Sequence, residues 1–306
     1  MKLLTRGSPL ALHQAEKVAE RIREMGHPVE IECWSTRGDR EACRPLCSFG
    51  GRGAFTSCLE ECLLQGRGDG AVHSLKDVPS CCRPGLAIAA VLPRDSSGDV
   101  LLCREDRTLL SLPEGGVVGT SSPRRKAQIL RARPDLTVAD LRGNLATRTG
   151  RLEEGHFDAI VLARAGLERL GMMPPHASDL PFLPAPCQGI IALETILDST
   201  LYRLGASFSH METLLCSIAE RSLLSSLGVG CHVPFGARGT LSGTTLLLEA
   251  EILEFRGREA VSLSLEASVR TGDDAARAGK ALGGIFRGNN AALRLLNDSL
   301  SGEDRP

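Results

Sequence analysis

The chain has 306 residues, of which 42% are hydrophobic and 24% are charged, values typical of a folded protein with more than one domain. Aromatic residues make up only 3% and the formal net charge is −1, which argues against a nucleic-acid-binding surface of stacked rings and basic side chains. The sequence has no apolar run that could span a membrane, and its first residues lack the pattern of a signal peptide. We therefore expect a cytoplasmic protein that binds neither membrane nor nucleic acid.

The eleven cysteines are an odd number in a chain without a secretion signal, which argues against a disulfide framework. Cys43 with Cys47, and Cys58 with Cys62, are pairs spaced by four residues. Neither pair has the C-x2-C spacing of zinc sites, and no histidine lies nearby. We predict no metal site and expect most cysteines to be small core residues.

The first third of the chain predicts alternating strands and helices. Apolar runs at 2–5, 29–35, 70–73 and 86–92 predict strands, while helical spacing predicts helices from Pro9 onward and over 54–65. This order favours a mostly parallel sheet with helices on both faces. Ligands of such sheets lie beyond the carboxyl ends of the strands. The polar residues that follow predicted strands are Arg6, Ser8, Asp39, Lys76 and Asp77.

A second α/β unit is predicted after a linker at 93–98. Its strands are expected at 100–103, 117–119, 136–139 and 159–162, and its helices at 123–132, 145–154 and 165–170. Residues 172–186 are rich in proline and predicted to be irregular, before a strand at 190–194 and a helix at 198–207. Crossings near 93–98 and 184–190 would create two lobes with a cleft between them.

The stretch from Gly119 to Arg151 concentrates positive charge. Ser121 or Ser122 is a plausible N-cap, and Pro123 suits the first helical position because that position needs no N–H donor. A helix start favours an anion, and arginines favour carboxylates or phosphates, so we predict an anion site. The alternative is a solvated basic helix face. The stretch has two acids, Asp135 and Asp140, against eight basic residues: Arg124, Arg125, Lys126, Arg131, Arg133, Arg142, Arg148 and Arg151.

The last third predicts a small α+β domain. Helices are expected at 210–227, 273–286 and 289–299, and an antiparallel meander at 237–241, 246–253 and 260–267. Cys231 lies in a loop with glycines before it and a proline after it, so a position inside a helix or strand is not expected. A thiol on a loop can act as a nucleophile or an attachment point, or it can be structural.

The chain contains nine distinctive motifs in this order: TRGSPLAL, TRGD, GGRGAF, AVHSLKDVP, VGTSSPRRKAQ, LRGNLATR, DAIVLARAGLERLG, LPAPCQGI and GVGCHVPFGA. With these motifs, in family order, the sequence resembles the hydroxymethylbilane synthase family, also called porphobilinogen deaminases, over essentially residues 1–240.

The resemblance implies an α/β fold of two type II periplasmic-binding-protein-like lobes with mostly parallel sheets, plus a C-terminal α+β domain with an antiparallel sheet. The expected domains are 1–93 with 190–207, then 98–185, then 210–306. The family condenses four porphobilinogen molecules onto a dipyrromethane cofactor and releases ammonia and the linear tetrapyrrole. The matching attachment residue is Cys231. The family also suggests a monomer and implies neither a metal nor a nucleotide.

The resemblance also implies roles for other residues. Asp77 matches the catalytic carboxylate, which helps to protonate the leaving amine and offsets the positive charge of the azafulvene intermediate. Lys76 matches a carboxylate-binding lysine, and Gln188 a glutamine expected to face the cofactor. The other positions expected to bind the carboxylates of cofactor or substrate are Arg6, Ser8, Thr120, Ser121, Ser122, Arg124, Arg125, Arg142, Arg148 and Arg169.

The sequence departs from the family pattern at a few positions. Arg52 stands where lysine is usual, Cys187 where glycine is usual, and Pro123 where leucine is commoner. Arg164 stands where the family usually has an uncharged residue, and the 41–49 loop carries unusual cysteines. The rival interpretation is a non-catalytic, two-lobed protein that binds an anionic solute. Such proteins usually carry a secretion signal and have no use for a domain that presents Cys231.

Overall fold

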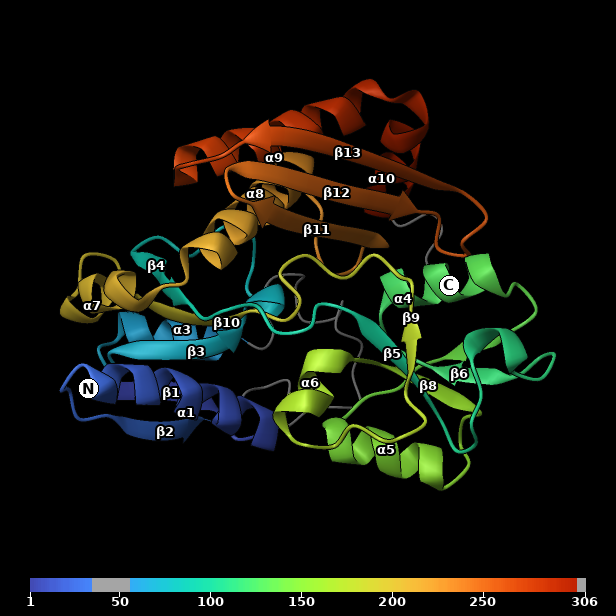
Figure 1. Cartoon of the computed structure of the whole chain (residues 1–306), viewed down its shortest axis with the longest axis horizontal. Coiled ribbons are helices and arrows are strands. Elements are labelled where there is room, and N and C mark those ends of the chain that lie inside the picture. The colour runs from blue at the N-terminus through green and yellow to red at the C-terminus, as the bar shows by residue number, and fades with distance from the viewer. Residues whose placement is uncertain (35–55, 302–306) are drawn as a thin grey trace. The chain divides into compact units, whose positions relative to one another are not determined.

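The structure is a computed structural model that describes residues 1–34 and 56–301 (Figure 1). The chain divides into two compact units. Unit 1 comprises Met1–Asp95 and Gln188–Leu215, and unit 2 comprises Ser96–Cys187 and Cys216–Pro306. The predicted division into three domains, with the boundaries given above, stays a prediction.

The sheet of unit 1 has five strands in the order β2-β1-β3-β10-β4. They are β1 (Lys2–Arg6), β2 (Glu30–Trp34), β3 (Gly70–Ser74), β4 (Leu86–Val91) and β10 (Ile191–Ile196). Strand β1 pairs in parallel with β2 and β3, whereas β10 runs antiparallel to both of its neighbours. Four strands therefore share one direction, and the one reversed strand is the one through which the chain re-enters the unit.

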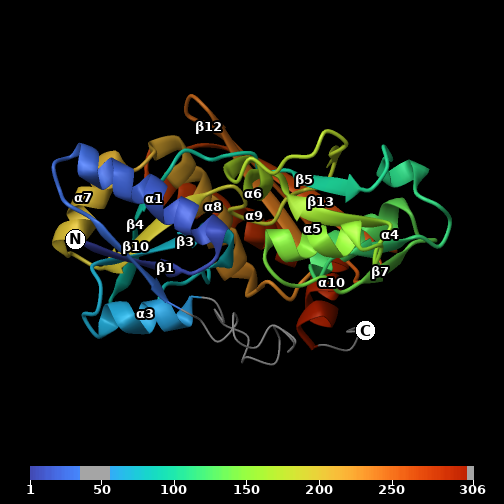
Figure 2. The ribbon, with the colours of Figure 1, turned by 90° about the horizontal axis from the view of Figure 1, so that it is seen from below.

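Helices cover both faces of this sheet, so its strands are buried on both sides. Leu3 belongs to a core formed with α1 (Pro9–Glu24) and α7 (Thr200–Phe208). The next residue, Leu4, packs on the opposite face with Leu59 and Leu63 of α3 (Ser57–Leu64). Figure 2 shows α1 and α3 on either side of β1. The alternation of successive side chains along a strand thus fills two separate cores.

The first sheet of unit 2 repeats this plan in the order β7-β6-β8-β5-β9. Strands β6, β7 and β8 are parallel, and β5 runs antiparallel to β8 and β9. The strands are β5 (Asp99–Cys103), β6 (Val117–Gly119), β7 (Thr137–Ala139), β8 (Ala159–Ala163) and β9 (Ser178–Leu180). The predicted α/β class with mostly parallel sheets is confirmed.

Strand β9 corrects the prediction that 172–186 is irregular throughout. It has only three residues, Ser-Asp-Leu, and pairs with β5 at the sheet edge through Asp99 opposite Leu180. Such a short segment has no apolar alternation of its own, so the neighbouring strand determines its conformation.

Helices also cover both faces of this sheet. Ile129 of α4 (Pro123–Ala132) packs with Val118 and Val161 on one face. The opposite face packs against α5 (Leu145–Glu153) and α6 (Arg164–Arg169). Figure 1 shows α4 and α5 on opposite sides of the strands.

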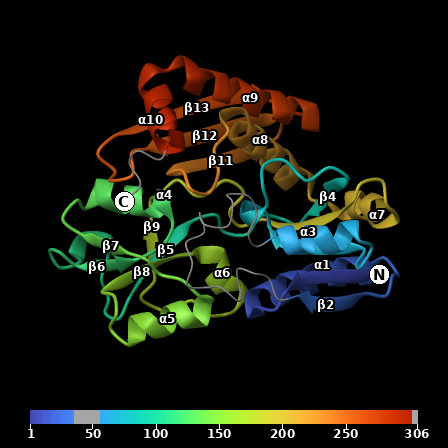
Figure 3. The same cartoon turned by 180° about the vertical axis from the view of Figure 1, so that it is seen from behind.

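The rest of unit 2 is a three-stranded antiparallel sheet with helices, as predicted. The strands are β11 (Phe235–Ser242), β12 (Thr245–Leu253) and β13 (Ala260–Ser268), with β12 in the middle. Helices α9 (Gly272–Gly288) and α10 (Asn290–Ser301) lie along this sheet (Figure 3), and α8 (Met211–Leu227) precedes it. None of the helices in the described ranges is long and apolar enough to cross a membrane.

Candidate functional site

In unit 1, several predicted site residues lie at one edge of the sheet. Arg6 is the last residue of β1, and Lys76 and Asp77 lie in the short 3₁₀ helix η2 (Leu75–Asp77) directly after β3. Strands β1 and β3 are parallel neighbours, so their carboxyl ends share an edge. Asp77 is exposed and Lys76 is half-buried, so the Asp77 carboxylate can be reached from solvent.

Gln188 reaches the same edge through the reversed strand. Ile191 at the start of β10 pairs with Ser74 at the end of β3, which carries the residues just before β10 past η2. The Lys76 ammonium donates a hydrogen bond of 3.2 Å to the Gln188 side-chain oxygen, and the Arg94 Nε donates to its backbone oxygen at 2.9 Å. Gln188 is buried, so Lys76 is held by a fixed partner.

Ser8 is the N-cap of α1. Its hydroxyl oxygen accepts a hydrogen bond of 3.3 Å from the Ala11 N–H, and Pro9 follows at the first helical position. The side chain therefore has a structural partner at the helix start next to Arg6.

Cys187 has a left-handed backbone conformation, with φ of 62°. A residue with a Cβ is strained there, and glycine is not. The Cys187 N–H donates to the carboxylate of the fully buried Glu220, which also accepts from the Gly239 N–H at 2.7 Å. These bonds hold the strained residue in place. The left-handed conformation explains why the glycine that is usual in the family suits this position.

In unit 2, the turn after β6 forms the predicted helix start. The Ser122 hydroxyl accepts from the Arg125 N–H at 3.4 Å, and Pro123 occupies the first position of α4, so Ser122 is the N-cap. Thr120 is buried, and its hydroxyl accepts from the Ser122 N–H at 3.3 Å. Ser121 instead ties the turn to the loop after β7, because its hydroxyl donates to the Leu141 oxygen at 3.1 Å and accepts from the Leu141 N–H at 3.0 Å.

Arg124 and Arg125 are buried, with exposed fractions of 3% and 7%, which excludes a solvated helix face for these two residues. Both guanidinium groups bind the fully buried carboxylate of Asp99, each with an Nη2–oxygen distance of 2.7 Å. Burial lowers the pKa of Arg124, and the charge of Asp99 opposes this shift. Two cations thus share one anion, which leaves an excess of positive charge at the start of α4.

Asp99 was not among the residues predicted from the sequence. The signal was present, because an acidic residue at the start of a buried strand requires a buried partner. Which cation would serve as that partner depends on packing between β5 and α4, which brings Asp99 to Arg124, 25 residues later in the chain.

Replacing Asp99 with asparagine is expected to lower the free energy of unfolding by about 3 to 5 kcal/mol, because two buried guanidinium groups would lose their counter-charge. Chemical denaturation followed by far-UV circular dichroism measures the change. The control is Asp179→Asn, which removes an exposed pairing to Arg164 and should cost less than about 1 kcal/mol. Equal effects of the two substitutions would contradict this account of Asp99.

Other predicted arginines follow the strands of the same parallel set. The Arg142 guanidinium lies 3.6 Å from the Asp140 carboxylate after β7. The Arg148 Nε donates to the Gly143 oxygen at 2.8 Å, and Arg169 is the last residue of α6, after β8. Since β6, β7 and β8 are parallel, their following segments begin at one edge of the sheet.

Arg164 has a structural explanation. Its guanidinium binds Asp179 of β9 at 2.5 Å and Glu168 at 3.4 Å, and the hydrogen bond to Asp179 raises its pKa. The charge that departs from the family pattern therefore attaches α6 to the edge strand.

Cys231 lies in the loop between α8 and β11 and is exposed. Val229 and Val233 on either side of it are buried, and the Val233 N–H donates to the Gly230 oxygen at 3.1 Å. The flanking residues hold the loop while the residue between them faces solvent. The predicted loop position is confirmed, and the role as an attachment point stays a prediction.

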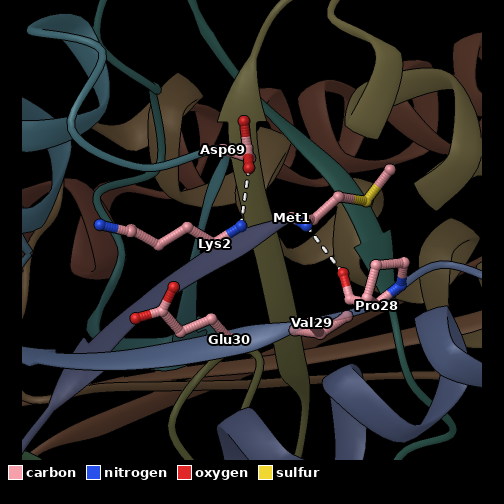
Figure 4. A pocket seen from close by; sticks show the side chains of 6 residues that line it. All are labelled: Met1, Lys2, Pro28, Val29, Glu30 and Asp69. Carbon is pink, nitrogen blue, oxygen red and sulfur yellow. Dashed lines mark hydrogen bonds between the residues drawn. The ribbon is translucent and has the colours of Figure 1, made fainter.

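A surface hollow of about 460 Å³ lies at the other end of β1, around Lys2 and Asp69 (Figure 4). The Lys2 N–H donates to the Asp69 carboxylate at 2.6 Å, and the Met1 amino group donates to the Pro28 oxygen at 2.7 Å. None of the predicted site residues lines it. Among the described residues, no group of three histidine, cysteine or acidic side chains could hold a metal ion.

Some predictions fall outside the described residues. These are the TRGD motif with Asp39, the GGRGAF motif with Arg52, and the 41–49 loop with Cys43 and Cys47.

Comparison with known proteins gives family matches over most of the chain. A family model described as "Porphobilinogen deaminase, dipyromethane cofactor binding domain" matches residues 1–203, and the C-terminal domain model of the same family matches residues 214–286. A probable porphobilinogen deaminase of Archaeoglobus fulgidus is 46% identical over 264 residues, covering 83% of this chain and 89% of its own length.

Another relative spans almost the whole chain. A probable porphobilinogen deaminase of Methanosarcina barkeri is 40% identical over 309 residues, covering 98% of both chains. Among solved structures, a periplasmic substrate-binding protein from Coxiella burnetii has 15% identity and a TM-score of 0.45, covering 68% of this chain and 91% of its own. The two domain models and these relatives show that the chain belongs to the porphobilinogen deaminase family.

Proposed function

We propose that this protein is a hydroxymethylbilane synthase of tetrapyrrole biosynthesis. In this proposal it condenses four porphobilinogen molecules stepwise onto a dipyrromethane primer held covalently by Cys231. One ammonia leaves at each condensation, and water then releases the linear tetrapyrrole. The observation that carries the proposal is an exposed thiol between two buried valines, in a chain that belongs to this family.

The chain's own residues fit such a primer. Cys231 offers an accessible thiol, which can form a thioether once it is deprotonated. The dipyrromethane group, when bound, supplies the pyrrole carbon to which the next substrate is joined. Its acetate and propionate groups require cations. The start of α4 supplies them, because the guanidinium groups of Arg124 and Arg125 both bind the one carboxylate of Asp99.

The other arginines bind the growing chain in this proposal. Each added pyrrole brings two carboxylates, so a series of guanidinium groups is required rather than a single one. Arg142, Arg148 and Arg169 follow the parallel strands of unit 2, and Arg6 is the last residue of a parallel strand of unit 1.

Asp77 carries the proton transfer. Its exposed carboxylate follows a buried strand, where it can protonate the leaving amine, accept a hydrogen bond from the pyrrole N–H and offset the positive charge that develops. Lys76 beside it is fixed by the Gln188 side chain and binds a substrate carboxylate. Acid and cation are thus adjacent in sequence but have different tasks.

Incubation of the purified protein with porphobilinogen tests the proposal. We expect ammonia to be released together with a linear tetrapyrrole, which is detected by its absorbance after oxidation. The rival function, binding of an anionic solute without reaction, predicts saturable binding of porphobilinogen and no ammonia. That outcome would reject the proposed activity. Cytoplasmic location and a monomeric state stay predictions.

A further inference from the structure

Helix α4 is attached to the antiparallel sheet of unit 2. The turn between β12 and β13 approaches the helix so closely that a Cβ on Gly257 would lie 2.2 Å from the Ala127 oxygen and 2.6 Å from the Arg131 nitrogen. Gly257 also has a φ of 72°, so glycine is required there for both reasons. The backbone of α4 is therefore in direct contact with the sheet that follows the Cys231 loop.

A buried carboxylate next to this contact binds two side chains of α4. Glu251 of β12 is 5% exposed. Its Oε2 accepts from the Gln128 side-chain nitrogen at 3.2 Å, and its Oε1 accepts from Arg131 and, at 2.8 Å, from the Ser262 hydroxyl of β13. Glu251 thus joins the helix to two neighbouring strands through one charged group.

The same hydrogen-bond chain continues to the arginines at the start of α4. Gln128 is fully buried, and its side-chain oxygen accepts from Arg124 Nη1 at 2.9 Å. Arg124 in turn binds Asp99, so the chain runs without interruption from Asp99 to Glu251. Burial lowers the pKa of Arg124, and the negative charges of Asp99 and, to a smaller extent, Glu251 oppose this shift.

A short backbone segment connects this chain to the cysteine loop. The Leu183 oxygen accepts from Arg124 Nη1 at 2.8 Å and from the Gln128 side chain at 3.1 Å. The next oxygen, of Pro184, accepts from the Ala237 N–H of β11 at 3.0 Å. Gly236 of β11 lies in register with Glu251, and β11 begins four residues after Cys231. Residues 183–184 therefore join β11, the strand that follows the Cys231 loop, to Arg124 and Gln128 of α4.

We infer that Glu251 is a positioning residue, which holds Arg124 on α4 in register with the strand that follows the Cys231 loop. This inference rests on the proposed function. Glu251 does not touch substrate. It acts through Gln128, Arg131 and Ser262. The buried guanidinium group of Arg124 can then bind a carboxylate of the pyrrole group attached to Cys231 without first having to reorient.

The test is the substitution Glu251→Gln in the full chain, which keeps the size of the side chain and removes its charge. Steady-state kinetics with porphobilinogen are expected to show KM raised about tenfold with kcat changed less than about twofold, because a carboxylate-binding group is displaced while Asp77 is untouched. The matched control is Glu249→Gln, which makes the same change two residues earlier on the same face of β12 and should leave both constants unchanged.

Three outcomes would overturn the inference. They are a lowered melting temperature with unchanged KM, an equal rise of KM in Glu249→Gln, or failure of both Glu251→Gln and Gln128→Met to fold. The last outcome would give these contacts a purely structural role. Gln128→Met removes the same link from the α4 side, and its KM is measured if Glu251→Gln does not fold. Absence of ammonia release by the unmodified protein would reject the proposed function instead, so the two failures can be distinguished.

Discussion

Replacement of Cys231 by serine is expected to remove a covalent adduct of two pyrrole units and to reduce activity with porphobilinogen to background. The thioether requires a thiolate, and a serine hydroxyl remains protonated and is a much weaker nucleophile. Intact-mass spectrometry of the unmodified protein and the variant, purified in the same way, measures the adduct directly.

Cys81→Ser is the control, because Cys81 is another exposed cysteine of the described chain and its replacement should leave the adduct in place. An unmodified mass for folded wild-type protein that has been exposed to substrate would reject the proposed enzyme. An adduct that persists in Cys231→Ser would move the attachment to another residue, and peptide mapping would then find it.

Replacement of Asp77 by alanine is expected to lower turnover by a factor of about 10² to 10⁴ while the Cys231 adduct remains. Without the carboxylate, the leaving amine loses its proton donor and the developing positive charge loses its nearest anion. The rate of ammonia release measures turnover, and the intact mass measures the adduct on Cys231. Only the rate of ammonia release should change.

The control for Asp77 lies at the opposite end of strand β3. Asp69→Asn changes an acidic residue beside the amino end of that strand, where the carboxylate accepts from the Lys2 N–H, and should leave turnover within about twofold. Wild-type turnover in Asp77→Ala would show that Asp77 takes no part in the reaction and that another group donates the proton.

The buried arginines of α4 connect stability and binding in one cluster. A buried carboxylate with two guanidinium groups is a costly arrangement, since each charge loses its hydration. A third partner, the substrate carboxylate, would offset the remaining positive charge. A protein selected for stability alone would have little reason to bury both arginines, and this supports a binding role for Arg124 and Arg125 alongside their structural one.

Local patterns predicted the secondary structure well where the signal lay within a few residues. Ser122 and Pro123 start α4 as their side chains require, and the glycines and proline around Cys231 keep it in a loop. The short strand β9 was missed because its conformation depends on pairing with Asp99–Cys103, more than seventy residues earlier in the chain.

The sequence by itself determined the family, the order of strands and helices, and the residue types available for chemistry, because motifs and periodicity depend on neighbours along the chain. Only the tertiary structure decided how the charged groups are paired. Asp99 binds Arg124 across 25 residues, and Glu251 binds Gln128 across 123. Such pairs form because sheet pairing and burial bring distant polar groups together away from water, where each must find a partner.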